Sequence, residues 1–178
     1  MSHIDVRERL EEWSQEYGHS YHPPASPEQI EELEFVLGAS LPSDYREFVL
    51  NCADGGTNGY DVLVPSKEQV EHYLDEDRNA RLRRSFPFNQ EHASILGKGE
   101  EAQLDLPIAV WDGKQFGKDG LDGTLVIQHS GYVGSSYLIV RGELAGRICY
   151  TGYGIAGIHP FESFTEWLRS EEWSYNCG

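Results

Sequence analysis

The sequence lacks the features that mark membrane, secreted or disulfide-stabilised proteins. No apolar run approaches the roughly 20 residues that cross a bilayer, so we predict no transmembrane helix. Residues 1–12 contain no apolar segment of the kind that a secretory signal requires, and we expect no such signal. The 178 residues include only three cysteines, an odd number, which favours reduced thiols and a cytoplasmic location.

Basic residues are also scarce, because 14 lysines and arginines stand against 30 acidic residues and leave a net charge of -16. Residues 1–60 alone hold twelve acidic residues and three arginines. Such a surface repels phosphates and anionic lipids and attracts basic proteins. The composition therefore disfavours binding to nucleic acid or membranes and favours a basic protein partner. The alternative is that the acidity only keeps the protein soluble.

Motifs for metal and cofactor binding are missing as well. The chain contains no C-x-x-C, H-x-x-x-H or H-E-x-x-H pattern, and the aspartates among the glycines of 112–122 do not match a calcium-binding loop. Residues 152–157 match G-x-G-x-x-G, but only about 20 residues follow, too few to complete a dinucleotide-binding unit. We interpret this segment as a turn and predict neither a metal nor a cofactor.

The first half of the chain has the spacing of amphipathic helices. Apolar residues indicate an opening helix that ends at Gly18. A capping box at Ser26 and Gln29, with Pro27 at the first helical position, predicts a second helix that ends at Gly38. A third helix follows Pro42, and a fourth is expected over residues 66–84.

The second half changes to short β-rich runs separated by glycines. Residues 60–64 and 107–111 are predicted strands, and the runs 124–129, 136–140 and 144–151 predict an antiparallel meander. A last helix is expected from Phe161 to about Trp173. Helices first, strands grouped and a closing helix indicate an α+β fold, with N-terminal helices packed on a mostly antiparallel sheet. Without a long linker, we expect a single domain over 1–178.

Three segments carry a family resemblance. They are the helix pair with L-P-x-x-Y-x-x-F-V-L at 41–50 and D-G-G at 54–56, the segment 106–113, and P-F-E-S-F-T-E-W-L at 160–168. This combination resembles the SUKH superfamily over about residues 26–170, although Gly123 precedes Thr124 where members often have Asp or Asn. That superfamily includes the fungal cell-wall assembly regulator and many bacterial immunity proteins. The resemblance implies a non-enzymatic protein-binding module.

A catalytic role has few candidates. Cys149, paired with His129 or His159, is the only nucleophile that we consider for a small thiol hydrolase. Cys149 lies in an apolar run, where a buried and inert thiol is the usual finding. The serines lack a G-x-S-x-G elbow. We therefore expect no enzymatic activity.

A protein-binding surface is the remaining possibility. Aromatic residues dominate interface energetics, and several of them lie in predicted loops beside acids and glycines. We predict a surface made of Asp54, Tyr60, Asp61, Trp111, Asp112, Phe116, Asp119, Asp122, Tyr132 and Tyr153. The alternative is that each tyrosine half-buries its ring at a sheet edge.

Together with the resemblance, this surface favours an immunity protein that binds and neutralises a basic toxin domain, such as a nuclease, by electrostatic and steric occlusion. A regulatory or scaffold domain like that of the cell-wall regulator is the second hypothesis.

Overall fold

The computed structural model describes residues 3–58, 61–73, 76–91, 121–130, 134–152, 155–159 and 161–170. Its helices are α1 (His3–Tyr17), α2 (Pro27–Leu37), α3 (Ser43–Asn51), α4 (Ser66–Tyr73), α5 (Glu76–Leu82) and α10 (Phe164–Arg169). Its strands are β1 (Ser20–Tyr21), β2 (Gly56–Asn58), β3 (Asp61–Leu63), β4 (Thr124–Ser130), β5 (Gly134–Ile139), β6 (Ile148–Gly152) and β7 (Ile155–Ile158).

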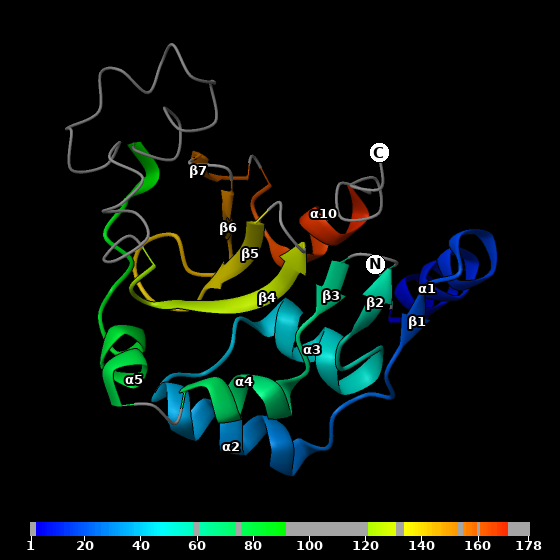
Figure 1. Cartoon of the computed structure of the whole chain (residues 1–178), viewed down its shortest axis with the longest axis horizontal. Helices are drawn as coiled ribbons and strands as arrows, with labels where there is room; N and C mark the ends of the chain where they lie inside the picture. Colours follow the sequence, from blue (N-terminus) through cyan, green and yellow to red (C-terminus); the bar gives the residue numbers. More distant parts are fainter. Residues whose placement is uncertain are drawn as a thin grey trace.

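The seven strands form one sheet in the order β1-β2-β3-β4-β5-β6-β7, and every neighbouring pair is antiparallel. The sheet runs from β1, beside α1, to β7 at the opposite end (Figure 1). A register shift between Val126 and Gln128 interrupts the β4–β5 ladder. The α+β class and the antiparallel meander of β4, β5 and β6 are confirmed.

Helix α2 forms where its local signals place it. The Ser26 side chain accepts a hydrogen bond from the Gln29 amide (3.3 Å), and the Gln29 side chain accepts one from the Ser26 amide (2.7 Å). Gly38 ends the helix with φ +60°, a left-handed conformation that glycine adopts without steric cost. The predicted capping box and glycine C-cap are both present.

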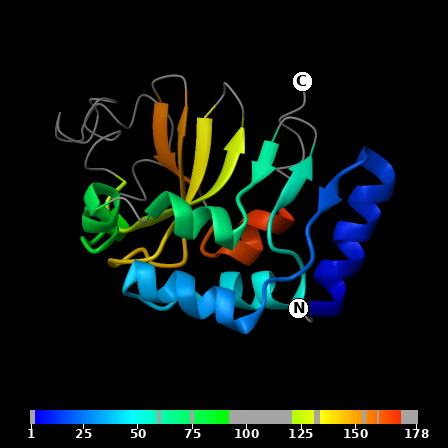
Figure 2. The same cartoon turned by 60° about the horizontal axis from the view of Figure 1, so that its bottom comes forward.

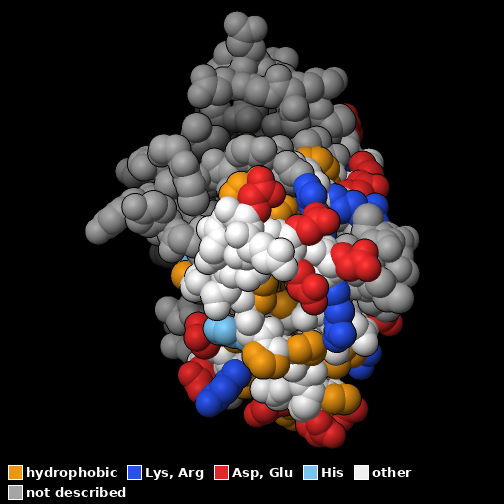
Figure 3. Space-filling view, turned by 90° about the vertical axis from the view of Figure 1, so that its right-hand side faces the viewer, with side chains coloured by type: hydrophobic (Ala, Val, Ile, Leu, Met, Phe, Trp, Pro, Cys, Tyr) orange, Lys and Arg blue, Asp and Glu red, His pale blue; other side chains and the backbone are white. Residues whose placement is uncertain are grey.

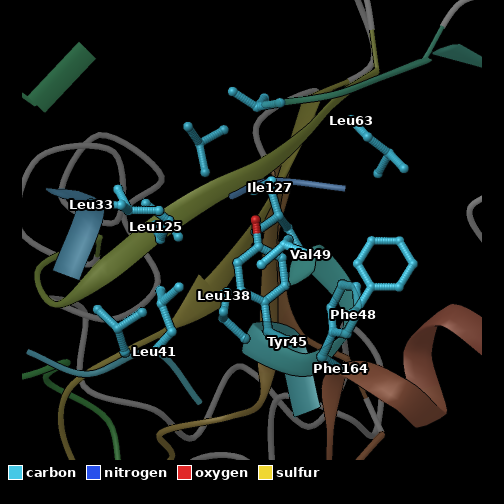
Figure 4. Packing of buried hydrophobic residues seen from close by; sticks show 14 of the residues in the cluster. Leu33, Leu41, Tyr45, Phe48, Val49, Leu63, Leu125, Ile127, Leu138 and Phe164 are labelled. Atoms are coloured by element: carbon cyan, nitrogen blue, oxygen red, sulfur yellow. The ribbon is translucent and has the colours of Figure 1, made fainter. Parts of the chain in front are cut away.

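Most of the core lies between the helices and one face of the sheet. In Figure 2, α2, α3 and α10 lie beneath the strands, and α1 stands beside the sheet. Side chains of α2 and α3 pack there against β4, β5 and α10, as Figure 4 shows for Leu33, Phe48, Leu125, Leu138 and Phe164. The Tyr45 and Phe164 rings meet edge to face with centroids 4.9 Å apart, which joins α3 to the closing helix. Helix α10 therefore completes the core.

The opposite face of the sheet is covered by a smaller cluster. Phe86 and Phe88, which follow α5, pack on Ile139, Cys149 and Ile158. The two phenylalanine rings contact each other edge to face, with centroids 5.2 Å apart. The sheet is thus apolar on both faces in its second half, which explains why β4 and β5 are rich in buried aliphatic residues.

Several elements differ from the sequence prediction. The span 66–84 holds two helices, α4 and α5, with residues 74 and 75 outside the described part. Acidic residues favour a helix N-terminus, so the run 75–77 suits the start of α5 better than a helix interior.

Strands β2 and β7 were not predicted, because both lie in glycine-rich segments that resemble turns. In β7, a Cβ atom at Gly157 would lie 2.6 Å from the Tyr150 hydroxyl on β6. Glycine therefore serves close packing between paired strands there, and this glycine pattern belongs to a β-hairpin rather than a nucleotide site.

The closing helix starts at Phe164 and not at Phe161. The Ser163 side chain caps it by accepting from the Glu166 amide (3.2 Å), and Asp44 at the start of α3 accepts from the Thr165 amide (3.0 Å). Phe161 is half-buried just before the helix. The described part of α10 ends at Arg169, and the predicted continuation to Trp173 lies outside the described residues.

Candidate protein-binding surface

Seven of the ten residues in the predicted binding surface lie outside the described residues, so for them the surface stays a prediction. They are Tyr60, Trp111, Asp112, Phe116, Asp119, Tyr132 and Tyr153. The predicted strand 107–111 lies outside them as well. Asp61 is placed through its backbone only, in β3, where it pairs with Asn58 and Ser130.

Asp54 is buried, with 6% of its surface exposed. One carboxylate oxygen accepts a hydrogen bond from the Ser66 amide (2.9 Å) and the other from the Ser66 hydroxyl (2.6 Å). Ser66 is the first residue of α4, so Asp54 satisfies an amide that the helix itself leaves without a partner. Asp54 therefore acts inside the fold and does not present its charge to a partner.

Asp122 is also buried, with 7% exposure, in the turn before β4. One carboxylate oxygen lies 3.4 Å from the Arg84 guanidinium, which is itself largely exposed. This pair ties the segment after α5 to the start of β4. Asp54 and Asp122 are corrected from exposed contact residues to internal ones.

The proposed thiol pair does not form. Cys149 points into the cluster of Phe86 and Ile158, and burial raises the pKa of its thiol well above the usual range. His159 follows Ile158 along the chain and therefore lies on the opposite face of the sheet. Its ring contacts Tyr150, with centroids 4.8 Å apart, and burial lowers its pKa to about 4.

His129, the other base considered for Cys149, is exposed on β4. Its Nδ1 atom lies 2.9 Å from the Ser135 hydroxyl. Burial of Cys149 keeps its sulfur away from this exposed ring. Neither imidazole is therefore paired with the thiol.

The surface of the described residues has grooves, two of which are considered for a site. One, of about 530 Å³, lies between the start of α3, the turn after β5 and the start of α10, and contains Asp44 and Glu162. The other, of about 430 Å³, lies between α1 and residues 21–24, and its lining includes the half-buried Cys52. Burial raises the pKa of the Cys52 thiol, so this cysteine is not an activated nucleophile. The lining of this groove also includes His22, so the raised pKa of Cys52 is what argues against a thiol nucleophile there.

Histidine, cysteine and acidic side chains of the described residues form no cluster of three that could hold a metal ion. Among the described helices, none is both long enough and apolar enough to span a bilayer.

Helices α1 and α2 both expose several glutamates, and the two helices differ in their basic residues. On α1, glutamates alternate with Arg7 and Arg9, and Arg9 lies 3.1 Å from Glu12. On the side of the molecule where α1 lies, acidic, basic and hydrophobic side chains are interspersed (Figure 3). Helix α2 has four glutamates and no basic residue. Of these two helices, α2 is therefore the one whose charged side chains are all negative.

The same helix carries Phe35, which is 84% exposed. The prediction from sequence did not include this residue, because it searched for binding aromatics in loops. A signal was nevertheless present. Phe35 falls outside the i, i+3, i+4, i+7 stripe of Ile30, Leu33 and Leu37, so helical periodicity places it on the solvent face.

Comparison with known proteins identifies a family for this chain. No curated protein matches the chain at a significant level. The sequence profile described as the SMI1 / KNR4 family (SUKH-1) matches residues 24–170, which is most of the chain and contains α2, α3, the sheet from β2 onward and α10. These are the elements that build the core between the helices and the sheet, and the chain belongs to the SMI1 / KNR4 family (SUKH-1).

Proposed function

We propose that this protein is an immunity protein that binds a basic toxin domain and neutralises it without chemistry of its own. Membership of the SUKH family makes the chain a toxin-immunity or cell-wall-regulator-like module, and the family is generally non-catalytic. The positions of Cys149 and His159 agree with a non-catalytic role, since the sheet separates them. Two buried or half-buried free thiols, Cys149 and Cys52, are consistent with a reducing cytoplasm.

The net charge of -16 is the observation that carries the proposal. A nuclease toxin must be basic around its substrate groove, because it holds phosphates there. A strongly acidic inhibitor is attracted to the same groove, associates faster than a neutral one and competes with the nucleic acid. Occlusion of this kind requires no catalytic residue in the inhibitor.

A titration tests the proposal. A candidate toxin domain from an adjacent reading frame is purified, and its activity on its substrate is measured while the chain is added. We expect activity to fall linearly and to disappear at one chain per toxin domain. Bovine serum albumin, another acidic protein, serves as the control and leaves the activity unchanged. Full toxin activity at a saturating excess of the chain would contradict the proposal.

The cell-wall-regulator type is the second candidate, because the matching family includes it by name. In that case the chain binds a resident protein of its own cell as a regulatory or scaffold domain. The two candidates separate in the titration, since a regulatory domain has no effect on a neighbouring toxin. They also separate in vivo, because deletion of an immunity protein is lethal only while the toxin is present.

A further inference from the structure

Phe35 on α2 is the most exposed of the three large hydrophobic residues found at the described surface; the other two are Tyr17, at 51%, and Val62, at 38%. A single exposed apolar side chain is common on soluble proteins and needs no explanation by itself. What distinguishes Phe35 is its surroundings on the helix.

Three glutamates share the outer face of α2 with Phe35. Glu28, Glu31 and Glu32 are exposed and precede Phe35 by seven, four and three residues, so all four side chains lie on one side of the helix. Hydrogen bonds with its own backbone amide and with the Ser26 side chain lower the pKa of Glu28, which therefore remains charged in mildly acidic solution. The aromatic ring is thus flanked by negative charge.

This charge is not neutralised inside the molecule. The fourth glutamate, Glu34, is occupied, because its carboxylate accepts from the Leu41 amide (2.9 Å) and lies 3.4 Å from Arg46. Within the described residues, Glu28, Glu31 and Glu32 form no ion pair. The charges of these three carboxylates are therefore not balanced by a cation of the described residues and can pair with cations of a partner.

The platform beneath this face is firmly held. The inner face of α2 is buried through Ile30, Leu33, Val36 and Leu37. At the end of the helix, the Arg141 guanidinium donates to the carbonyl oxygens of Leu37 (3.2 Å) and Gly38. A rigid element loses little conformational freedom when it binds, so more of its contact energy appears as affinity.

We infer that the outer face of α2 (Glu28, Glu31, Glu32 and Phe35) is the surface that contacts the basic toxin domain, with Phe35 as its anchor. The inference rests on the proposed function. The occupant is a protein surface on which lysines or arginines surround an apolar depression. The cations pair with the three glutamates, and the depression takes the phenyl ring. Interfaces commonly combine one buried aromatic residue with a polar rim in this way.

The helix α1 surface suits this partner less well, although it also exposes an aromatic residue and glutamates. Arg7 and Arg9 would repel the cations of a basic partner, and Arg9 already pairs with Glu12. Charge complementarity therefore favours α2 over α1.

The test measures binding of the purified toxin domain to variants of the full chain by surface plasmon resonance. Phe35→Ala is expected to weaken the affinity at least tenfold. The triple variant Glu28→Gln, Glu31→Gln, Glu32→Gln is expected to weaken it and to reduce its dependence on salt. Tyr17→Ala and the pair Glu68→Gln, Glu71→Gln are matched controls from α1 and α4, and both should bind within twofold of wild type. All these side chains are exposed, so thermal unfolding of each variant should match that of wild type.

The possible failures can be told apart. If the wild-type chain binds the toxin domain and the α2 variants bind equally well, the surface lies elsewhere and this inference is wrong while the proposed function stands. If the wild-type chain does not bind the toxin domain, the proposed function fails and the inference fails with it. If the Glu68→Gln, Glu71→Gln control loses as much affinity as the glutamate variant of α2, the toxin responds to total charge. If Tyr17→Ala loses as much as Phe35→Ala, the anchor is not specific to α2. Either result also overturns the inference.

Discussion

The two faces of α2 show how one helix separates stability from recognition. On the inner face, Leu33 and Leu37 have no exposed surface and pack into the core. On the outer face, Phe35 is almost fully exposed beside three glutamates. Both faces contain large apolar side chains, so composition alone does not distinguish them. The environment of these side chains distinguishes the two faces. The same kind of substitution is therefore expected to have a different effect on each face.

The largest contrast is expected between Leu33→Ala and Phe35→Ala. The first leaves a cavity in the core and should lower the free energy of unfolding by about 2–5 kcal/mol. The second removes an exposed ring and should change it by less than about 0.5 kcal/mol. Urea denaturation followed by circular dichroism measures both. Equal losses would mean that the outer face is also part of the core.

A second prediction concerns His159, a buried group that titrates, in contrast to the exposed glutamates of α2. The pKa of His159 is lowered to about 4 by burial, whereas that of an unfolded histidine is about 6.5. The unfolded chain therefore binds a proton first as the pH falls. Stability from the neutral ring is complete above about pH 6.5 and is lost towards pH 4, by about 2–3 kcal/mol.

The readout for His159 is the difference between wild type and His159→Gln. The free energy of unfolding of both proteins is measured at pH 7 and pH 4.5. The carboxylates that the two chains share contribute equally to both, so their contribution cancels in the difference. Wild type is expected to lose more stability than the variant between these values. If wild type and variant lose the same free energy of unfolding between these pH values, the ring is accessible to protons in the folded state.

A third contrast compares a buried carboxylate with an exposed one. Asp54→Ala removes both hydrogen bonds to Ser66 and leaves the amide at the start of α4 unsatisfied, which should cost about 2 kcal/mol. Glu31→Ala removes a solvated charge and should change stability by less than about 0.5 kcal/mol. Chemical denaturation of the two variants checks this difference. A small effect of Asp54→Ala would show that water can replace the aspartate.

The smallest contrast concerns the N-terminus of α2. Ser26→Ala removes the side-chain cap and should cost about 1 kcal/mol, whereas Ser26→Gly should cost only a few tenths. Thermal melts of the two variants measure the difference. A melting temperature of Ser26→Ala equal to that of wild type would indicate that the capping box contributes nothing to the folded protein.

Helix α2 was predictable from sequence because its signals are local. Ser26, Gln29 and Gly38 lie within one short segment, and the structure uses each as its chemistry suggests. Strands β2 and β7 depend on partners instead. Gly56 pairs with Leu63, and Gly157 with Tyr150, so glycine-rich segments become strands only through contacts across the sheet. Single-segment patterns do not contain that information.

The candidate surface was harder to predict for a related reason. The burial of Asp54 depends on Ser66, twelve residues further on, and that of Asp122 involves Arg84, 38 residues away. From sequence, both resemble solvated loop acids. Phe35 is the opposite case, since helical spacing alone places it outside the apolar stripe. Loop position was therefore a poor guide to the exposure of these two aspartates, whereas helical periodicity indicates the exposure of Phe35.

The salt dependence of binding tests the central claim most directly. Calorimetric titration of the toxin domain with the wild-type chain at 50, 150 and 500 mM sodium chloride (about the range over which screening becomes strong) measures affinity and stoichiometry together. The account predicts one chain per toxin domain and an affinity that falls at least tenfold across this range. Binding that is unaffected by salt, or no binding at 50 mM, would contradict a partner recognised through negative charge.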